Sequence, residues 1–393
     1  MTEPKHRLDQ ILKEIGREAQ ELQARTQRVM NLMEKPLETE IGSTPYEVVY
    51  QEDRIRLKHY KAEGERKIKT PLLIVYALIN RETMLDLQPG RSVVRSLLDA
   101  GLDLYMIDWG YPTRKDRFQT IEDHVCGYMD NVVEFIRRRS GSDQLNLMGV
   151  CMGGTFSVMY ASLFPEKIRN LITTVSPTNF DTDKGLLHLW VRGLDVDRLV
   201  DACGNIPGDM MNFGFLLLNP ARLMIDKYVG FLDNADKKEF VENFFRMEKW
   251  IFDSPDVPGE TFREFLKDLY QKNLLIKNEL ELGGKRVDLK KITMPVLNIY
   301  GRFDHLVPPE AAGKLHEHVG SKDAEDFCMD TGHIGIFVSG KAQKELVPKI
   351  VGFLGKRDAA GKAPARKRPA SGTTNRKPRT TQKPKMKSGV KTP

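Results

Sequence analysis

The stretch G-V-C-M-G-G at 149–154 constrains the fold of this chain more than any other segment. It follows an apolar run at 145–148 and precedes a helix-like segment at 155–164. This pattern predicts a strand, a sharp turn and a helix, which is the setting of a G-x-S-x-G nucleophile elbow with Cys151 in the serine's place. The flanking glycines allow a tight bend, and the positive end of a helix favours a thiolate. Such a string can also occur by chance in a glycine-rich turn, so the assignment depends on partner residues elsewhere.

Two later loops offer partners for this cysteine in the order nucleophile, acid, histidine, which is the order of enzymes with such an elbow. A strand-like run at 296–300 ends in a turn that exposes Asp304, and a run at 326–329 is followed by His333, ahead of a final helix at 341–354. A loop aspartate often only caps a helix, and a loop histidine often has no role. Three loop residues in the right order nevertheless predict Cys151 as nucleophile, His333 as general base and Asp304 as the residue that orients the histidine.

Short apolar runs alternate with helical segments over most of the chain. This alternation predicts an α/β fold, in which a mostly parallel sheet is covered by helices on both faces. The expected strands lie at 48–50, 55–59, 72–76, 104–107, 145–148, 171–175, 296–300 and 326–329. The expected parts are an N-terminal amphipathic helix (1–40), a first core segment (41–177), a cap insertion (178–291), a second core segment (292–356) and a disordered basic tail (357–393).

The segment 178–291 differs from the core segments because it combines helical patterning with many large apolar residues. We expect it to lie over the strand ends and to cover the nucleophile with an apolar surface that admits water poorly. Most of its large residues are expected to form the cap's own core. These residues are Trp190, Phe213, Phe215, Leu216, Leu217, Phe244, Phe245, Trp250 and Phe252. The N-terminal segment 5–34, which has apolar residues at helical spacing, either packs on its own core or docks onto a partner subunit.

Composition agrees with an enzyme of the reduced cytosol. Neither an apolar run of roughly 20 residues nor the apolar core of a signal peptide is found, so no transmembrane segment is expected. The four cysteines show neither C-x-x-C pairing nor a disulfide framework. Metal binding has little support, because His316 and His318 would point to different sides of a helix. His305, beside Asp304, would lie at the rim of the cleft, where it either takes part in binding or catalysis or is simply a wet surface histidine.

The last residues of the chain are strongly basic. Residues 356–393 contain 13 Lys or Arg and one acidic residue, Asp358, and they lack leucine, isoleucine and aromatic residues. Such a segment cannot form a core and is expected to be disordered. It is either a solvated tail or a segment that binds DNA or another polyanion through its charge alone.

The chain resembles the poly(3-hydroxyalkanoate) synthases, specifically the short catalytic subunits of the two-subunit class III and class IV enzymes. The resemblance runs from about residue 44 to about residue 353 and leans toward class III at 248–253. The motifs that carry it lie at 72–81, 105–110, 149–154, 204–208, 248–253, 304–309 and 332–334. The family's cysteine, acid and histidine fall on Cys151, Asp304 and His333. The basic extension after Lys356 departs from the family pattern.

The resemblance implies an α/β-hydrolase fold and the polymerisation of 3-hydroxyacyl-CoA, with release of CoA and acyl-cysteine intermediates. Acyl-CoA is then a substrate, and no cofactor or metal is expected. The backbone N–H groups of Met152 and Ile79 are the candidate donors to the oxyanion. The family implies short 3-hydroxy acids, a second subunit, a homo-oligomeric catalytic chain, and a cytoplasmic location on polymer granules. A cysteine hydrolase or thioesterase on the same scaffold, and a non-enzymatic granule or nucleoid protein, are the competing interpretations.

Overall fold

The centre of the molecule is an eight-stranded sheet with the strand order β1-β2-β4-β3-β5-β6-β9-β10. The computed structural model describes residues 3–33, 37, 39–62 and 64–360. From β4 to β10 neighbouring strands are parallel, whereas β2 runs antiparallel to both β1 and β4. The strands are β1 (Glu47–Glu52), β2 (Ile55–Tyr60), β3 (Leu72–Val75), β4 (Leu104–Asp108), β5 (Leu145–Val150), β6 (Ile168–Thr174), β9 (Val296–Gly301) and β10 (Ala324–Met329). Each predicted strand therefore has a counterpart in this sheet.

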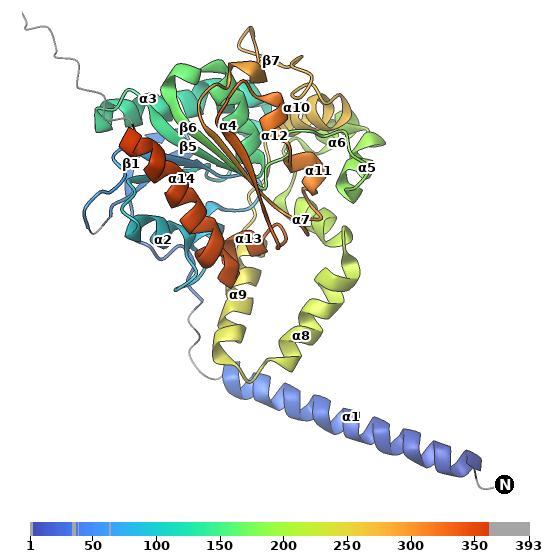
Figure 1. The fold of residues 1–393 in the computed structure, drawn as a ribbon. Coiled ribbons are helices and arrows are strands. Elements are labelled where there is room, and N and C mark those ends of the chain that lie inside the picture. Colours follow the sequence, from blue (N-terminus) through green and yellow to red (C-terminus); the bar gives the residue numbers. More distant parts are fainter. Residues whose placement is uncertain (1–2, 34–36, 38, 63, 361–393) are drawn as a thin grey trace, which may run out of the picture.

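Helices cover both faces of the sheet, so the predicted α/β class is confirmed (Figure 1). On one face α3 (Met129–Ser140) and α4 (Met152–Leu163) pack on β5, and on the other α2 (Val93–Asp99) packs with α14 (Val347–Ala360). All residues of β3, β4 and β5 are buried. Burial on both faces is why these strands appear in the sequence as continuous apolar runs rather than alternating ones.

The cap is the helical segment between β6 and β9, and part of it forms an arm that extends away from the sheet (Figure 1). The arm consists of the antiparallel pair α8 and α9, with α7 leading into it. The cap helices are α5 (Leu186–Arg192), α6 (Val196–Cys203), α7 (Gly208–Leu217), α8 (Lys227–Asp233), α9 (Lys238–Phe252) and α10 (Gly259–Glu264). A small hairpin of β7 (Glu281–Leu282) and β8 (Lys285–Arg286) follows, which the sequence patterns did not predict. Short helices α11 (Pro309–Ala312), α12 (Leu315–His318) and α13 (Gly335–Val338) complete the second core segment.

The N-terminal helix α1 (Glu3–Met33) lies across the tip of this arm (Figure 1). Arg25 of α1 pairs with Asp233 at the end of α8, with 2.6 Å between Nη1 and Oδ1. Leu12, Ile15 and Met30 are more than half exposed. The helix therefore contacts the cap and not the sheet, and the side chains just named are not part of a core.

The last helix continues past the predicted start of the basic tail at residue 357. Asp358 accepts hydrogen bonds from the amides of Lys69 and Thr70, and Arg357 stacks on the ring of Phe353 and pairs with Asp323. These contacts hold the first residues of that segment against the sheet, so α14 reaches Ala360. The rest of the predicted tail, 361–393, lies outside the described residues. Among the helices that the structure describes, none is long and apolar enough to cross a membrane.

Candidate active site

Cys151 lies in the sharp turn between β5 and α4, where the sequence predicts a nucleophile elbow. Its backbone has φ 52° and ψ −125°, a combination that side-chain-bearing residues rarely adopt. Two backbone hydrogen bonds of Cys151 hold the turn. The Cys151 amide donates to the carbonyl oxygen of Thr174 at 2.9 Å, and the Cys151 carbonyl oxygen accepts from the amide of Gly154 at 2.9 Å. The half-buried thiol consequently faces a cavity at the carboxyl end of the sheet.

Gly153 and Gly154 are required by close packing rather than by their own backbone angles. A Cβ atom on Gly153 would lie 2.3 Å from the carbonyl oxygen of Val75, and one on Gly154 would lie 1.7 Å from Oγ of Ser176. The first turn of α4 is therefore pressed against the ends of β3 and β6. The sequence interpretation gave the tight bend to the glycines, but Cys151 itself makes the bend and the glycines make room for it.

Unusual backbone conformations occur at the carboxyl ends of three neighbouring strands. Asn80 after β3, Cys151 after β5 and Val175 after β6 have φ values of 57°, 52° and 46°. A β-branched residue such as Val175 is an outlier in this region of conformational space. Such strain persists only where the surrounding structure imposes it, and it is concentrated at functional sites. The sheet edge near Cys151 is thus the best candidate for an active site on backbone geometry alone.

Asp304 and His333 meet at this same edge, from the loops after β9 and β10. His333 Nδ1 and Asp304 Oδ2 are 2.7 Å apart, and the carboxylate is fully buried. The other carboxylate oxygen, Oδ1, accepts from the amides of Leu306 and Val307, each at 2.9 Å. Both oxygens of Asp304 are therefore engaged, and the histidine ring is fixed with its second nitrogen free to face the thiol.

The electrostatics of His333 depend on its two partners. Burial disfavours the imidazolium, but the negative charges of Asp304 and Cys151, with a hydrogen bond to each, outweigh burial and raise the pKa of His333. The same charges act on Tyr270, whose hydroxyl has a pKa raised first by burial and then by Cys151 and Asp304. The array therefore favours a protonated imidazole at His333 beside the thiol of Cys151, an arrangement that activates a cysteine nucleophile.

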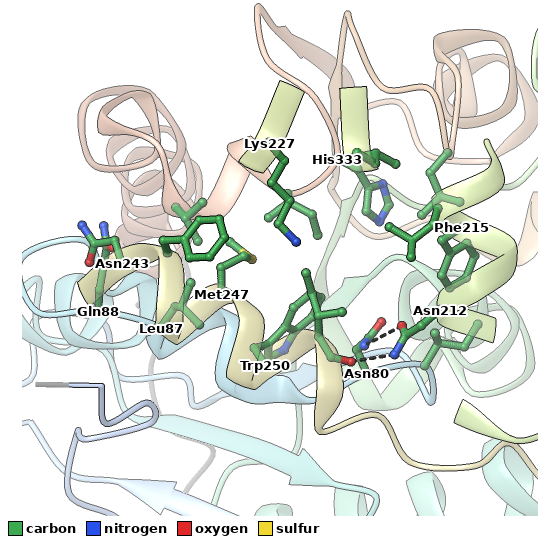
Figure 2. A pocket seen from close by; sticks show the side chains of 18 of the residues that line it. Asn80, Leu87, Gln88, Asn212, Phe215, Lys227, Asn243, Met247, Trp250 and His333 are labelled. Carbon is green, nitrogen blue, oxygen red and sulfur yellow. Dashed lines mark hydrogen bonds between the residues drawn. The ribbon is translucent and has the colours of Figure 1, made fainter. Parts of the chain in front are cut away.

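A cavity of about 760 Å³ opens above this array. Cys151, His333 and His305 line it. Phe215 of α7 and Trp250 of α9 contribute to the lining from the cap (Figure 2). Most of the other lining side chains are apolar, and the charged ones include Arg91, Lys227, Lys237 and Glu239. The cavity is lined both by Cys151 at the end of the sheet and by residues of α7 and α9.

One candidate oxyanion donor directly follows Cys151, and the other lies in a loop that lines the same cavity. Met152 is the first residue of α4, directly after Cys151, and Ile79 lies in the loop after β3 and lines the cavity. Amides at the first turn of a helix have no partner inside the helix, so the Met152 N–H is available to a bound carbonyl oxygen. The assignment of these two N–H groups remains a prediction.

His305, which follows Asp304 in the loop after β9, is among the residues that line the cavity. Burial lowers the pKa of its imidazole; the charge of Asp304 opposes this effect, and the positive charges of His333 and Arg222 add to it. The ring is therefore neutral at pH 7 and can donate or accept a hydrogen bond at the cavity wall. Its function remains a prediction.

Sequence reasoning missed several polar side chains near the thiol. Tyr270 lies close enough to Cys151 and Asp304 for their charges to act on its hydroxyl. Asn80 and Asn212 line the cavity and meet at 3.3 Å, from Asn80 Nδ2 to Asn212 Oδ1 (Figure 2). Asn80 follows a predicted strand, which is a usable signal. Tyr270 and Asn212 lie within the cap segment, where no motif marks them.

The expectation that most large residues of the cap form its own core is wrong. Phe215, Leu216, Phe244 and Trp250 line the cavity instead. Trp190, Phe213, Leu217 and Phe252 are exposed, Phe252 by 71%. Trp250 is nevertheless buried, and Phe244 and Phe245 pack with Phe231 in a small aromatic cluster of the arm. The other members of the set face the cavity or solvent. Within residues 3–33, 37, 39–62 and 64–360, no cluster of three or more His, Cys, Asp or Glu could hold a metal ion.

Comparison with known proteins places this geometry in a family. Residues 70–339 match the model of the alpha/beta hydrolase fold, and residues 6–97 match that of the poly-beta-hydroxybutyrate polymerase (PhaC) N-terminus. A soluble variant of monoglyceride lipase from Saccharomyces cerevisiae is similar in structure, with a TM-score of 0.50 and 13% identity, covering 82% of this chain and 98% of the lipase. That likeness concerns the fold alone.

The curated relatives are much closer in sequence. The poly(3-hydroxyalkanoate) polymerase subunit PhaC of Allochromatium vinosum is 50% identical over 318 residues, which cover 80% of this chain and 90% of the relative. The subunit of the same name from Thiocystis violacea is 48% identical over 343 residues, covering 86% and 97%. The chain therefore belongs to the poly(3-hydroxyalkanoate) polymerases, acyltransferases built on an α/β-hydrolase fold.

Proposed function

We propose that the chain polymerises 3-hydroxyacyl-CoA, for example (R)-3-hydroxybutyryl-CoA, through acyl thioesters on Cys151. The observation that supports this best is the array of Cys151, His333 and Asp304 at the base of an apolar cavity. The array supplies a nucleophile, a base and an orienting carboxylate. The cavity supplies space for an acyl chain. Acyl-CoA is the substrate, and the proposed chemistry needs no further cofactor.

In the loading step the Cys151 thiolate attacks the carbonyl carbon of the acyl-CoA thioester. A new C–S bond forms as the bond to the CoA sulfur breaks, and His333 returns its proton to the departing CoA thiolate. One thioester replaces another at nearly equal energy, so the acyl group remains activated. The N–H groups of Met152 and Ile79 are proposed to stabilise the negative charge on the carbonyl oxygen.

In the elongation step the 3-hydroxyl of a second unit replaces water as the acyl acceptor. His333, now neutral, takes the hydroxyl proton while the oxygen attacks the acyl-cysteine, and the thiolate of Cys151 is released. An ester bond replaces a thioester bond in each elongation step, and this exchange lowers the free energy and favours growth of the polymer. The lining supports this route over hydrolysis, because most of its side chains are apolar and do not hold a competing water.

Asp304 is proposed to act only through His333. Its carboxylate is fully buried, and its two oxygens already accept bonds from His333, Leu306 and Val307. A substrate hydroxyl would have to displace one of these donors to reach it. Orientation of the histidine and stabilisation of its positive charge are the roles that this geometry supports. His305, at the cavity wall, is proposed to position the substrate.

The relatives are named polymerase subunits, so we propose a second subunit of the class III type, a homo-oligomeric catalytic chain and a place at the surface of polymer granules. The basic tail is proposed to contact DNA or another polyanion. A truncation should end at Ala360, because Arg357 and Asp358 belong to the folded part. Unchanged retention of the truncated protein on DNA at low salt would disprove the tail's role.

Product analysis tests the proposal. The full chain, alone and with its second subunit, is incubated with (R)-3-hydroxybutyryl-CoA, beside Cys151→Ala and the matched control Cys203→Ala at an exposed cysteine of the cap. Polymer and free CoA from the wild type and Cys203→Ala, and neither from Cys151→Ala, are the expected result. Free 3-hydroxybutyrate in place of polymer would instead identify a thioesterase.

A further inference from the structure

The loop at 76–81, which carries the proposed oxyanion donor Ile79, is held on its core side by side chains of the sheet. Trp109 Nε1 donates to the carbonyl oxygen of Tyr76 at 2.9 Å. The guanidinium of Arg81 donates to Asp108 at 3.2 Å and to Glu82 at 3.1 Å. These contacts fix the first residue of the loop and the side chain of its last.

The cap holds the same loop from the opposite side. Trp250 Nε1, on α9, donates to the carbonyl oxygen of Arg81 at 2.8 Å. Asn80 Nδ2 donates to Oδ1 of Asn212 on α7 at 3.3 Å, and Nδ2 of Asn212 donates in turn to the carbonyl oxygen of Ile251 at 2.6 Å (Figure 2). Two cap helices are thus joined to each other and to the two residues that follow Ile79.

The loop needs this support because its backbone is strained. Asn80 has a φ of 57°, and a residue with a side chain stays in that region only where its surroundings impose it. Ile79 directly precedes this residue, and a relaxation at Asn80 shifts the backbone of Ile79 and with it the N–H in the peptide plane between residues 78 and 79. Trp250 is almost fully buried and also lines the cavity, where a bound acyl chain would pack on it.

We propose that the cap positions the second oxyanion donor, with Trp250 and Asn212 as positioning residues that hold the loop at 76–81 in its strained, catalytically competent form. The stabilisation of the oxyanion is then coupled to the seating of the cap on the sheet. A cap that lifts from the loop leaves the Cys151–His333–Asp304 array intact but removes one of its two oxyanion donors. The inference rests on the proposed acyl transfer at Cys151.

The test compares Trp250→Phe, which keeps an aromatic ring but loses the N–H donor, with Trp190→Phe, the same change at an exposed tryptophan of the cap. Both full-length proteins are assayed with their second subunit for CoA release from (R)-3-hydroxybutyryl-CoA. Alkylation of Cys151 by iodoacetamide is followed by mass spectrometry of its peptide. Alkylation needs the thiolate and access to it but forms no oxyanion, so it separates damage to the array from loss of the donor.

For Trp250→Phe we expect kcat to fall about 10- to 100-fold, with KM and the alkylation rate each within about threefold of wild type. Asn212→Ala is expected to behave in the same way, and Trp190→Phe to match the wild type. An unchanged kcat in Trp250→Phe and Asn212→Ala would overturn the inference. A fall in alkylation as large as the fall in kcat would overturn it too, because the lesion would then lie in the array or the fold.

A second measurement is independent of the substrate. Amide hydrogen exchange in peptides that cover the loop at 76–81 should be at least about tenfold faster in Trp250→Phe than in the wild type and unchanged in Trp190→Phe. Equal exchange in all three proteins would refute the positioning role even if the wild type proved to be an active polymerase. Faster exchange in Trp250→Phe, together with a wild type that releases no CoA, would instead reject the proposed function and keep the contact between cap and loop.

Discussion

The sheet and the cap contribute to the same cavity but are built in opposite ways. In the sheet and the helices packed on it, large side chains lie inside the protein. Phe156 and Tyr160 of α4, for example, have no exposed surface. In the cap, Phe244 and Trp250 face the cavity while Phe213 and Phe252 face solvent. The sheet therefore fixes the reacting groups, whereas the cap provides an apolar surface without a deep core of its own. The two parts are nevertheless coupled in the proposed mechanism, because Asn212 and Trp250 of the cap hold the loop at 76–81.

The largest effect is expected from Cys151→Ala, in the part built by the sheet. Loss of the nucleophile should lower CoA release by about 10⁴-fold or more, because the remaining groups cannot form an acyl-enzyme. Circular dichroism should show an unchanged fold, since the side chain is small and half-buried. Residual polymer from this variant would mean that a group outside the elbow carries the acyl chain.

Asp304→Asn should be the next most severe change. Removing the carboxylate charge lowers the pKa of His333, so the imidazolium beside Cys151 is lost at a lower pH. We expect kcat to fall about 10³- to 10⁴-fold and the alkylation of Cys151 at pH 7 to slow markedly. A direct role of the carboxylate on the substrate would predict lost activity with normal alkylation. Rates of CoA release and of Cys151 alkylation, measured between pH 5.5 and 9, distinguish an effect through His333 from a direct role of the carboxylate on the substrate.

A matched pair of substitutions tests the comparison itself. Phe156→Ala in α4 should lower the free energy of unfolding by about 3–5 kcal/mol, because a fully buried ring leaves a cavity behind. Phe244→Ala in α9 should lower it by less than about half as much. The second variant should instead release more free 3-hydroxy acid relative to polymer, as water enters the widened cavity. If urea unfolding shows equal losses of unfolding free energy in Phe156→Ala and Phe244→Ala, the cap has a hydrophobic core of its own.

His305→Gln should have the smallest effect. Burial lowers the pKa of His305, so the ring is neutral above pH 7 and a neutral replacement keeps the local charge. Loss of one hydrogen bond of about 1 kcal/mol corresponds to about a fivefold fall in kcat/KM. The ratio of variant to wild type should be the same at pH 7 and pH 8.5. A ratio that changes with pH would indicate that the imidazole transfers a proton.

Much of the sheet and of the array could be predicted because each part has a local signature. An apolar run indicates a buried strand, and a glycine or a polar turn residue indicates where that strand ends. Asp304 and His333 could therefore be assigned to loops after strands from the sequence alone. Asn212 and Trp250 had no such signature. Their partners, Asn80 and Arg81, lie 132 and 169 residues away along the chain, and contacts of that kind depend on how the cap sits on the sheet.

The prediction for the large side chains of the cap was wrong for a different reason. An apolar side chain is expected to be shielded from water, but the sequence does not say whether it packs in the protein interior or lines a substrate cavity. Phe215 and Phe244 meet the cavity because α7 and α9 stand apart on either side of it. Only the arrangement of the helices reveals that difference. The turn at 149–154 was predicted in place, but its strain was assigned to glycines when Cys151 bears it.

The strained backbone of Cys151 has a consequence for the evolution of this scaffold. A φ of 52° with ψ −125° is unstrained only for glycine, so the proposed nucleophile also destabilises the fold locally. Cys151→Gly should melt at a higher temperature than Cys151→Ala, since only glycine relaxes the turn. Inactive descendants of such a polymerase would therefore drift toward glycine at this position, and the sulfur persists there only while selection for polymer does.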